Sequence, residues 1–399
     1  MSSKHTPVTL LHEIQEQPEL FRACIKRYPQ MFEALSLTGS DIQGFKRVIG
    51  IAEGSSKHAL EMAAPFIEAW SGLPVTIIHP ENLEDSFHIL KKLPGVGPAY
   101  HPEDLFLAVS QSGETASVKR SLHRLKHRFP HLKHFLTLTN NPNSSLATEY
   151  PLHVCIEAGV EQSIAATKTM SVSFLTLLFL GLYLGKTRHY LSEGAHQQLL
   201  DTLTHLPEKI TAVWEPKRLA QLQVFTRSLM AVNHFILLSK GPLVLTLPEA
   251  GLKLTETSSN IVYTDNTESF KHGPKVMLSG IQGVHPNSIY VVPPSQDLAI
   301  RLYKDLRSHF WINPFQPNEA LAFDDDRVFF IEFENSVQVP ETVEKTLHID
   351  PEKHLMLPKA SLLESLFLCL ITFQTICYYL ACFKGEDPNN PALSKAVTT

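Results

Sequence analysis

The chain has 399 residues, of which 43% are hydrophobic and 19% charged, and its formal net charge is −5. This length favours two domains over a single core, and the composition is that of a globular protein, which argues against a disordered, fibrous or repeat protein. Because the sequence has no basic excess, nucleic acid is not expected as a partner.

The alternation of short apolar runs with helical segments predicts an α/β protein. Residues 12–35 have helical character, and from residue 46 short apolar runs alternate with longer helical stretches. Two sets of candidate strands follow this rhythm, at residues 48–52, 75–79, 105–109, 135–139 and 152–156, and at 235–238, 261–264, 289–292, 328–333 and 354–357. Continuous apolar strands between helices indicate parallel sheets with helices on both faces.

The same rhythm divides the chain into four parts. They are an N-terminal helical segment at 1–45, a first α/β domain at 46–205, a second at 206–382 and a C-terminal tail at 383–399. Two long connections, 86–104 and 309–326, exceed the usual loop length and are interpreted as insertions.

Two apolar stretches raise the question of a membrane span. Residues 170–185 are short for a bilayer, and residues 361–383 contain Glu364 and Gln374, which are costly in lipid. We interpret both as buried core helices and expect no membrane association. The five cysteines are odd in number and form no C-x-x-C pair, and the N-terminus lacks a secretory signal, so we expect free thiols in the cytoplasm and no metal site.

Two hydroxyl-rich turns follow candidate strands, where parallel sheets bind ligands. The run SQSGET (110–115) follows the third candidate strand, and the run GSS (54–56) follows the first. Hydroxyl groups, a glycine that permits close backbone approach and the N–H groups of a helix N-terminus together suit a phosphate group. The alternative is ordinary capping, with Ser112 as N-cap and Glu114 in the first helical turn. Two such turns after neighbouring strands favour the phosphate site.

These two turns resemble the phosphosugar site of the SIS (sugar isomerase) domain family. Further segments are similar, in the same order, to the isomerase domain of glucosamine-6-phosphate synthases: TNNPNSSLA from Thr139, AGVEQSIAATK from Ala158, PEAGLKLTE from Pro248, SFKHGP from Ser269 and the terminal KGEDPNNPALSKAVTT. The resemblance covers about residues 46–399. It implies two tandem SIS domains, each a five-stranded parallel sheet flanked by helices in a flavodoxin-like three-layer sandwich.

The resemblance also implies roles for individual residues. The positions that hold the sugar phosphate are Ser55, Ser56, Ser110, Gln111, Ser112 and Thr115. Glu256 matches the glutamate that moves a proton between C1 and C2, and His272 matches the histidine that opens the sugar ring. Lys395, in the tail, matches the lysine that covers the active site and can form a Schiff base with the ketose. Further active-site or substrate-binding positions match Lys253, Glu161, Gly54 and Ile164.

The chemistry of these residue types agrees with the implied roles. A single carboxylate placed between two carbons can remove and return the proton, and a histidine titrates near neutral pH, as ring opening requires. A lysine can capture a carbonyl covalently. Because the family donates its histidine across a subunit interface, the resemblance further implies a homodimer with shared active sites. It implies no cofactor.

On residue type alone, plainer interpretations exist. Glu256 could be a solvated helix carboxylate, and Lys253 could belong to an ion-pair ladder with Glu249 and Glu256. His272 could lie in a plain turn, and Lys395 in a disordered tail. The collinear resemblance favours the functional roles.

The sequence departs from the family at several positions. Only about 45 residues precede the first candidate strand, so we expect no glutaminase domain and the use of free ammonia. Glu53 stands beside the first turn, where the family usually has Cys or another uncharged residue, and a carboxylate there would repel phosphate unless it points away. Ala166, Ser117 and Ser394 also differ from the family pattern. These changes concern the substrate more than the reaction class.

Three functions from different classes follow. The first is interconversion of glucosamine-6-phosphate and fructose-6-phosphate with free ammonia, with deamination as the expected direction. The second is an enzyme of the same fold with another substrate, such as a ketosamine-6-phosphate deglycase or an aldose–ketose phosphate isomerase. The third is a non-catalytic sugar-phosphate sensor, which would have no need of Glu256, His272 and Lys395.

Overall fold

The computed structural model describes residues 9–83, 100–279, 286–309, 327–338, 341 and 350–389. The chain forms two compact units, each with its own sheet. Residues 16–204 make up the N-terminal unit, and residues 205–389 together with 9–15 make up the C-terminal unit. The segment that the sequence set apart at 1–45 is therefore divided between the units after residue 15.

The N-terminal unit is built on a five-stranded parallel sheet. Its strands are β1 (Arg47–Ala52), β2 (Val75–Ile78), β3 (Asp104–Val109), β4 (His134–Thr139) and β5 (Leu152–Cys155). They lie in the order β2-β1-β3-β4-β5, and every pairing is parallel. The five predicted apolar runs are confirmed as strands to within one residue at each end. A strand such as β3, buried along its whole length, needs apolar side chains on both faces, which is why an unbroken apolar run predicts it.

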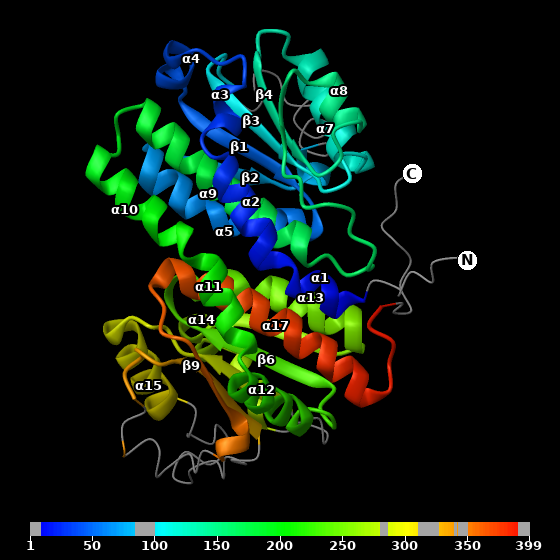
Figure 1. The fold of residues 1–399 in the computed structure, drawn as a ribbon, viewed down its shortest axis with the longest axis vertical. Coiled ribbons are helices and arrows are strands. Elements are labelled where there is room, and N and C mark those ends of the chain that lie inside the picture. Colours follow the sequence, from blue (N-terminus) through cyan, green and yellow to red (C-terminus); the bar gives the residue numbers. More distant parts are fainter. Residues whose placement is uncertain are drawn as a thin grey trace. The chain divides into compact units, whose positions relative to one another are not determined.

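Helices cover both faces of this sheet (Figure 1). They are α2 (Gln17–Arg27), α3 (Gln30–Glu33), α4 (Gly39–Gly44), α5 (Gly54–Ser71), α7 (Ala116–Arg128), α8 (Ser145–Glu149), α9 (Lys168–Thr187) and α10 (Glu193–Thr204). On one face α5 packs against α9. On the other, Val118 and Leu122 of α7 join Ile49, Ile51 and Phe106 of the sheet in one hydrophobic cluster. The unit is therefore the three-layer sandwich expected from the sequence.

The C-terminal unit repeats this architecture. Its strands are β6 (His234–Ser239), β7 (Ile261–Asn266), β8 (Asn287–Val291), β9 (Val328–Phe333) and β10 (His354–Leu357). They form a second five-stranded sheet in the order β10-β9-β8-β6-β7, again with parallel pairings throughout. The second set of predicted strands is confirmed, and with it the α/β fold of two tandem parallel sheets.

The described helices of the C-terminal unit also lie on both sides of its sheet (Figure 1). They are α1 (Leu10–Gln15), α11 (Leu206–Thr211), α12 (Pro216–Ser228), α13 (Leu247–Ser258), α14 (Thr267–Lys271), α15 (Gln296–His309) and α17 (Leu362–Lys384), with the 3₁₀ turns η1 (Ala212–Trp214), η2 (Gly241–Thr246), η3 (Pro274–Ser279) and η6 (Pro351–Lys353). On one face α17 packs against α12 and α13. On the other, Leu302 and Tyr303 of α15 pack on Ile236 and Tyr290 of the sheet.

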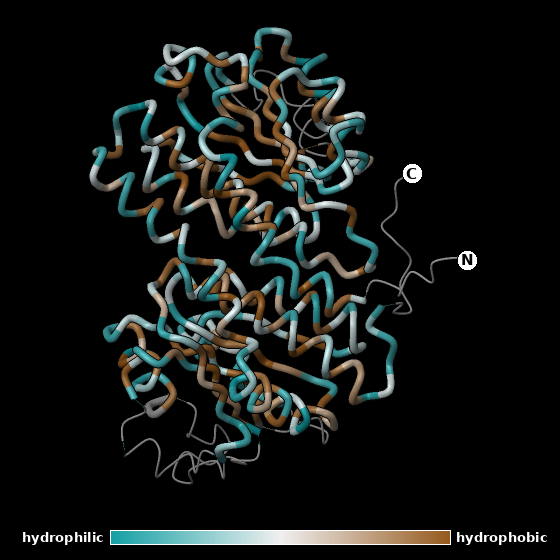
Figure 2. The backbone as a smooth tube through the Cα atoms, in the orientation of Figure 1, coloured by the Kyte–Doolittle hydropathy of each residue, from teal (hydrophilic) through white to brown (hydrophobic). Residues whose placement is uncertain are grey.

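The two most apolar helices, α9 and α17, form part of the cores. Both are long and apolar enough to cross a membrane, but 94% of the most apolar window of α9 and 78% of that of α17 is buried inside the structure. A capping box of Ser361 and Glu364 begins α17, which explains the acidic residue in this apolar stretch. Figure 2 shows hydrophobic residues along the strands and along the inner helices. The prediction of buried helices at 170–185 and 361–383 is confirmed.

Three features singled out in the sequence lie largely outside the described residues. The insertion at 86–104 is described only from residue 100, the insertion at 309–326 only at residue 309, and the tail only to residue 389. Lys395 is therefore outside the described part of the chain.

Candidate functional site

Two hydroxyl-rich turns meet at a topological switch point of the N-terminal sheet. Strand β1 pairs with β2 on one side and with β3 on the other, so the chain crosses to opposite sides of β1 in its first two connections. In open parallel sheets ligands bind outside the carboxyl ends of such strands. The GSS run follows β1 and the SQSGET run follows β3. The fold thus brings both runs together, and we call residues 54–56 and 110–115 the switch-point site.

The SQSGET loop is held by its own hydroxyl groups. The Ser110 side chain, 2% exposed, lies 2.7 Å from the Thr115 hydroxyl and accepts a hydrogen bond from the Gly113 N–H at 3.1 Å. The Ser112 hydroxyl accepts from the Glu114 N–H at 3.1 Å. Helix α7 begins only after Thr115, its N-cap residue. The alternative with Ser112 as the N-cap is therefore wrong, because Ser112 closes a local turn instead.

Gly113 allows the loop to approach the turn after β4. Its φ is +67°, in the left-handed region that glycine tolerates best. A Cβ atom on Gly113 would lie 2.0 Å from the Ser144 Oγ. Ser144 is the N-cap of α8, where its hydroxyl accepts from the Ala147 N–H. Sequence reasoning missed this contact, although the segment from Thr139 that contains Ser144 was singled out as part of the resemblance.

The one acidic side chain of the SQSGET loop is engaged with α7 and α8. The Glu114 carboxylate accepts from the Ser145 N–H at 2.6 Å and from its hydroxyl at 2.8 Å, and it pairs with Lys119 at 2.6 Å. Bonds from Lys119 and Ser145 lower the pKa of Glu114 from 4.5 to about 2. Glu114 is thus ionised at neutral pH and its charge is balanced by Lys119.

The helix N-termini at the switch-point site favour an anion. Gly54 has φ +55° and turns the chain from β1 into α5, which places the half-buried Ser55 and Ser56 in the first helical turn. Neither α5 nor α7 carries an acidic residue in its first turn. Two helices therefore begin here with N–H groups and positive dipole ends that no first-turn acid offsets, although Glu53 directly precedes α5 as its N-cap residue. Together with the hydroxyl groups, this arrangement suits a phosphate group.

Glu161 has the contacts of a helix cap. Its carboxylate, 7% exposed, accepts from the Thr167 N–H at 2.6 Å, from the Thr167 hydroxyl at 3.1 Å and from the Thr169 hydroxyl. These groups belong to the start of α9, where a carboxylate compensates the free N–H groups and the helix dipole. Ile164 is half-buried in the connection before α9. The sequence suggested substrate contacts for both, and the capping by Glu161 was not foreseen.

In the C-terminal unit, three charged residues follow one another along α13. Lys253, 2% exposed, lies 3.4 Å from Glu249 and pairs with Glu256. Glu249 is 1% exposed, whereas the Glu256 side chain is 19% exposed. The lysine ammonium therefore joins a fully buried carboxylate to a partly accessible one. The contact with Lys253 fixes one oxygen of Glu256 and leaves the other available, as a proton-transferring carboxylate requires.

His272 directly follows α14 and is 78% exposed. Its Nε2 is 3.9 Å from Glu268. The helix that precedes it is held at both ends: Asn266 caps it through the Ser269 N–H, and the Lys271 ammonium pairs with Glu268 at 2.8 Å and with Asp305 of α15 at 2.6 Å. The anchored helix presents the histidine to its surroundings.

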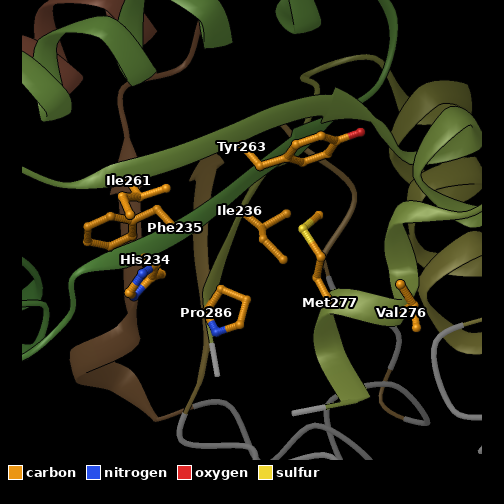
Figure 3. Close-up of a pocket in the computed structure, with 8 residues that line it drawn as sticks. All are labelled: His234, Phe235, Ile236, Ile261, Tyr263, Val276, Met277 and Pro286. Carbon is orange, nitrogen blue, oxygen red and sulfur yellow. The ribbon is translucent and has the colours of Figure 1, made fainter. Parts of the chain in front are cut away.

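An apolar cavity of about 280 Å³ lies at the amino ends of strands β6 and β7 in the C-terminal sheet (Figure 3). It is lined by His234, Phe235, Ile236, Ile261, Tyr263, Val276, Met277 and Pro286. His234 and Ile261 begin β6 and β7, so the cavity lies at the amino ends of the strands, away from the edge that binds ligands in parallel sheets. In the described ranges, no group of three or more His, Cys, Asp or Glu residues is arranged to hold a metal ion.

Comparison with known proteins relates this chain to sugar-phosphate enzymes. Residues 42–183 match the SIS domain family. Over 98% of its length the chain is 26% identical to a glutamine–fructose-6-phosphate aminotransferase (isomerizing) of Synechocystis and 25% identical to one of Pseudomonas aeruginosa. It spans 59% and 58% of the lengths of those proteins.

Solved structures share the fold over nearly the whole chain. The C-terminal domain of glucosamine-fructose-6-phosphate aminotransferase from Francisella tularensis has a TM-score of 0.78 at 21% identity, with 98% of this chain and 100% of that chain covered. Glucosamine-6-phosphate deaminase from Thermotoga maritima has a TM-score of 0.64 at 18% identity, with 97% and 99% covered. The tagatose-6-phosphate ketose/aldose isomerase of Escherichia coli has a TM-score of 0.68 at 16% identity, with 99% and 98% covered. Residues 42–183 therefore match the SIS domain, and the C-terminal unit repeats the five-stranded parallel architecture of the N-terminal unit.

Proposed function

We propose that the protein interconverts glucosamine-6-phosphate and fructose-6-phosphate with free ammonia, with deamination as the favoured direction. The observation that carries the proposal is the switch-point site, where two hydroxyl-rich turns and two helix N-termini without first-turn acids suit a sugar phosphate. Similarity to aminotransferases and deaminases of glucosamine and fructose phosphates supports this substrate class.

In this proposal the residues Ser55, Ser56, Ser110, Gln111, Ser112 and Thr115 hold the phosphate. His272 assists opening of the sugar ring. Glu256 then takes the proton from C2 of the open-chain aldose and returns it to C1, while a second proton passes from the C2 nitrogen to O1, which leaves an imine at C2. Water adds to this imine, and ammonia leaves to give fructose-6-phosphate. Lys253 holds the Glu256 carboxylate through its ammonium, and Lys395 is the residue that we expect to form a Schiff base with the ketose.

A second class of substrate is also compatible with this site. A ketosamine 6-phosphate, or a neutral aldose phosphate as for the similar tagatose-6-phosphate isomerase, would use the same proton transfer. In either case the enzyme needs no cofactor for the step, and we propose that it works in the cytoplasm. Binding of sugar phosphates without turnover of any would instead indicate a sensor.

Proton exchange at C2 tests the proposal. Glucosamine-6-phosphate is incubated with the protein in D₂O and followed by proton NMR, with ammonium assayed in parallel. We expect fructose-6-phosphate and ammonium in equal amounts. Glu256→Gln should lower the rate about 10²- to 10⁴-fold, the usual contribution of a general base, while sugar-phosphate binding persists. Thr255→Ala, a change at an exposed position of the same helix, is the matched control. Equal rates in Glu256→Gln and the parent would remove Glu256 from the mechanism.

We further propose a homodimer in which His272 acts on the partner's substrate. A mixture of Glu256→Gln and His272→Ala subunits tests this directly. If sites are shared, each mixed dimer contains one site without either change, and activity returns on mixing. Mixing without recovery, or full activity of a monomer in size-exclusion chromatography, would refute the shared site.

A further inference from the structure

Glu53 lies on the phosphate side of the switch-point site. It directly follows β1 with φ −134° and ψ 158°, so the extended backbone of the strand continues through it. Side chains alternate along a strand, and Ile49 and Ile51 belong to the cluster that faces α7. Gly50 instead faces Leu60 of α5. By this alternation Glu53 projects on the same side as α7.

The neighbouring strand places Ser110 beside Glu53. In β3, Phe106 and Ala108 share the cluster that faces α7, and Ser110 is the next residue on that side. The parallel register pairs Ile51 with Ala108 and Ala52 with Val109, so one step further along pairs Glu53 with Ser110. The Glu53 carboxylate therefore stands next to the loop that begins with Ser110.

The carboxylate of Glu53 is not committed to its own helix. Glu53 is the N-cap residue of α5, yet its side chain makes no capping hydrogen bond. The nearest basic residue along the helix, Lys57, pairs with Glu61 at 2.9 Å. Glu53 is half-buried, which limits the screening of its charge by water. Within the part of the chain that the structure describes, Glu53 has no ion pair, whereas the charge of Glu114 is balanced by Lys119.

A carboxylate beside a phosphate site weakens the binding of every sugar phosphate by repulsion, unless the ligand also carries a cation. An ammonium group next to the reacting carbons would supply that cation. It would donate a charge-assisted hydrogen bond to the carboxylate and cancel the repulsion. A neutral hexose phosphate has only hydroxyl groups to offer, so the same residue would disfavour it.

We propose that Glu53 is a specificity residue that accepts the ammonium group of an amino-sugar phosphate and discriminates against neutral hexose phosphates. This inference rests on the proposed function, because it assumes that the switch-point site binds the sugar phosphate. It narrows the substrate class to sugars with a primary or substituted amine near C1 or C2 and excludes a plain aldose–ketose isomerase.

Glucosamine-6-phosphate and glucose-6-phosphate form a matched pair for the test, since they differ only by an ammonium or a hydroxyl at C2. Equilibrium binding of both is measured by calorimetry for the parent, for Glu53→Gln and for Glu61→Gln, an acidic residue on the same helix. We expect the parent to prefer the amino sugar, and Glu53→Gln to weaken its binding about 10- to 100-fold, the usual range for a hydrogen bond to a charged group. Glucose-6-phosphate should bind Glu53→Gln as well as the parent or more tightly, and Glu61→Gln should leave both affinities unchanged.

The outcomes separate this inference from the proposed function. If Glu53→Gln loses affinity equally for both ligands while its circular dichroism spectrum is unchanged, Glu53 is not a specificity residue. The proposed function would not be affected by that result. The protein could instead bind a ketosamine 6-phosphate tightly through Glu53 and not bind glucosamine-6-phosphate. That result would support ammonium recognition by Glu53 and identify a different substrate. If the parent binds no sugar phosphate, the proposed function and the inference both fall.

Discussion

Gly113 offers a sharp test of how the switch-point site is built. Gly113→Ala forces a side chain into the left-handed region, at a cost of about 1–2 kcal/mol. The new Cβ would also lie 2.0 Å from the Ser144 Oγ and 2.4 Å from the Ser144 Cβ, which is an overpacking of about 1–3 kcal/mol. We therefore expect a loss of about 2–5 kcal/mol in the free energy of unfolding.

Gly54→Ala is the matched control. Its φ of +55° imposes the same backbone cost, but no atom lies within 4 Å of the added Cβ. This variant should lose only about 1–2 kcal/mol. Urea unfolding followed by the fluorescence of Trp70 measures both, since Trp70 is the only tryptophan in residues 16–204 and the other two can be replaced by Phe. Equal losses in the two variants would refute the close contact between the SQSGET loop and Ser144.

Three further changes test the charges of the two units. Glu161→Ala should destabilise the fold by about 1–3 kcal/mol, because it removes the carboxylate that accepts from the buried Thr167 N–H. If the variant binds sugar phosphate with the same Kd as the parent, Glu161 caps α9 and does not bind the substrate. The pKa of Glu114 is lowered from 4.5 to about 2, so its carboxylate stabilises the fold above its unfolded pKa, and this contribution is lost as the pH falls toward 2. Glu114→Gln should therefore show a smaller decrease in the free energy of unfolding over that pH range, as measured by urea titrations at a series of pH values. Lys253→Met removes the ammonium beside the buried Glu249 and should cost about 3–5 kcal/mol, with partial recovery in the double variant with Glu249→Gln; an additive double variant would mean that the pair is not coupled.

The secondary structure follows closely from the sequence because its causes are local. A strand buried on both faces is apolar throughout, so unbroken apolar runs in the sequence predict β3 and β9. The sequence predicts α9 and α17 as buried helices for the same reason, because both segments are apolar over many residues. The two hydroxyl-rich turns were also found locally, from the residue types that follow each strand.

The partners of the charged side chains did not follow from the sequence. Glu114 looked like a first-turn residue of a helix, but its carboxylate bonds Ser145, 31 residues further along the chain. The resemblance matches Glu161 to an active-site position, which stays a prediction, and it gives no sign that the carboxylate accepts a hydrogen bond from the start of α9. Hydrogen bonds of this kind depend on loop geometry, which the period of the apolar residues does not encode.

The sequence by itself determined the α/β class, the positions of both sets of strands and the presence of two turns suited to phosphate. Only the tertiary structure decided that these turns share one site, because β3 pairs with β1 rather than with β2, which precedes it in the chain. The physical reason is that strand order and register arise from the packing of distant segments onto one core, whereas apolar runs and turn residues report only on their own neighbours.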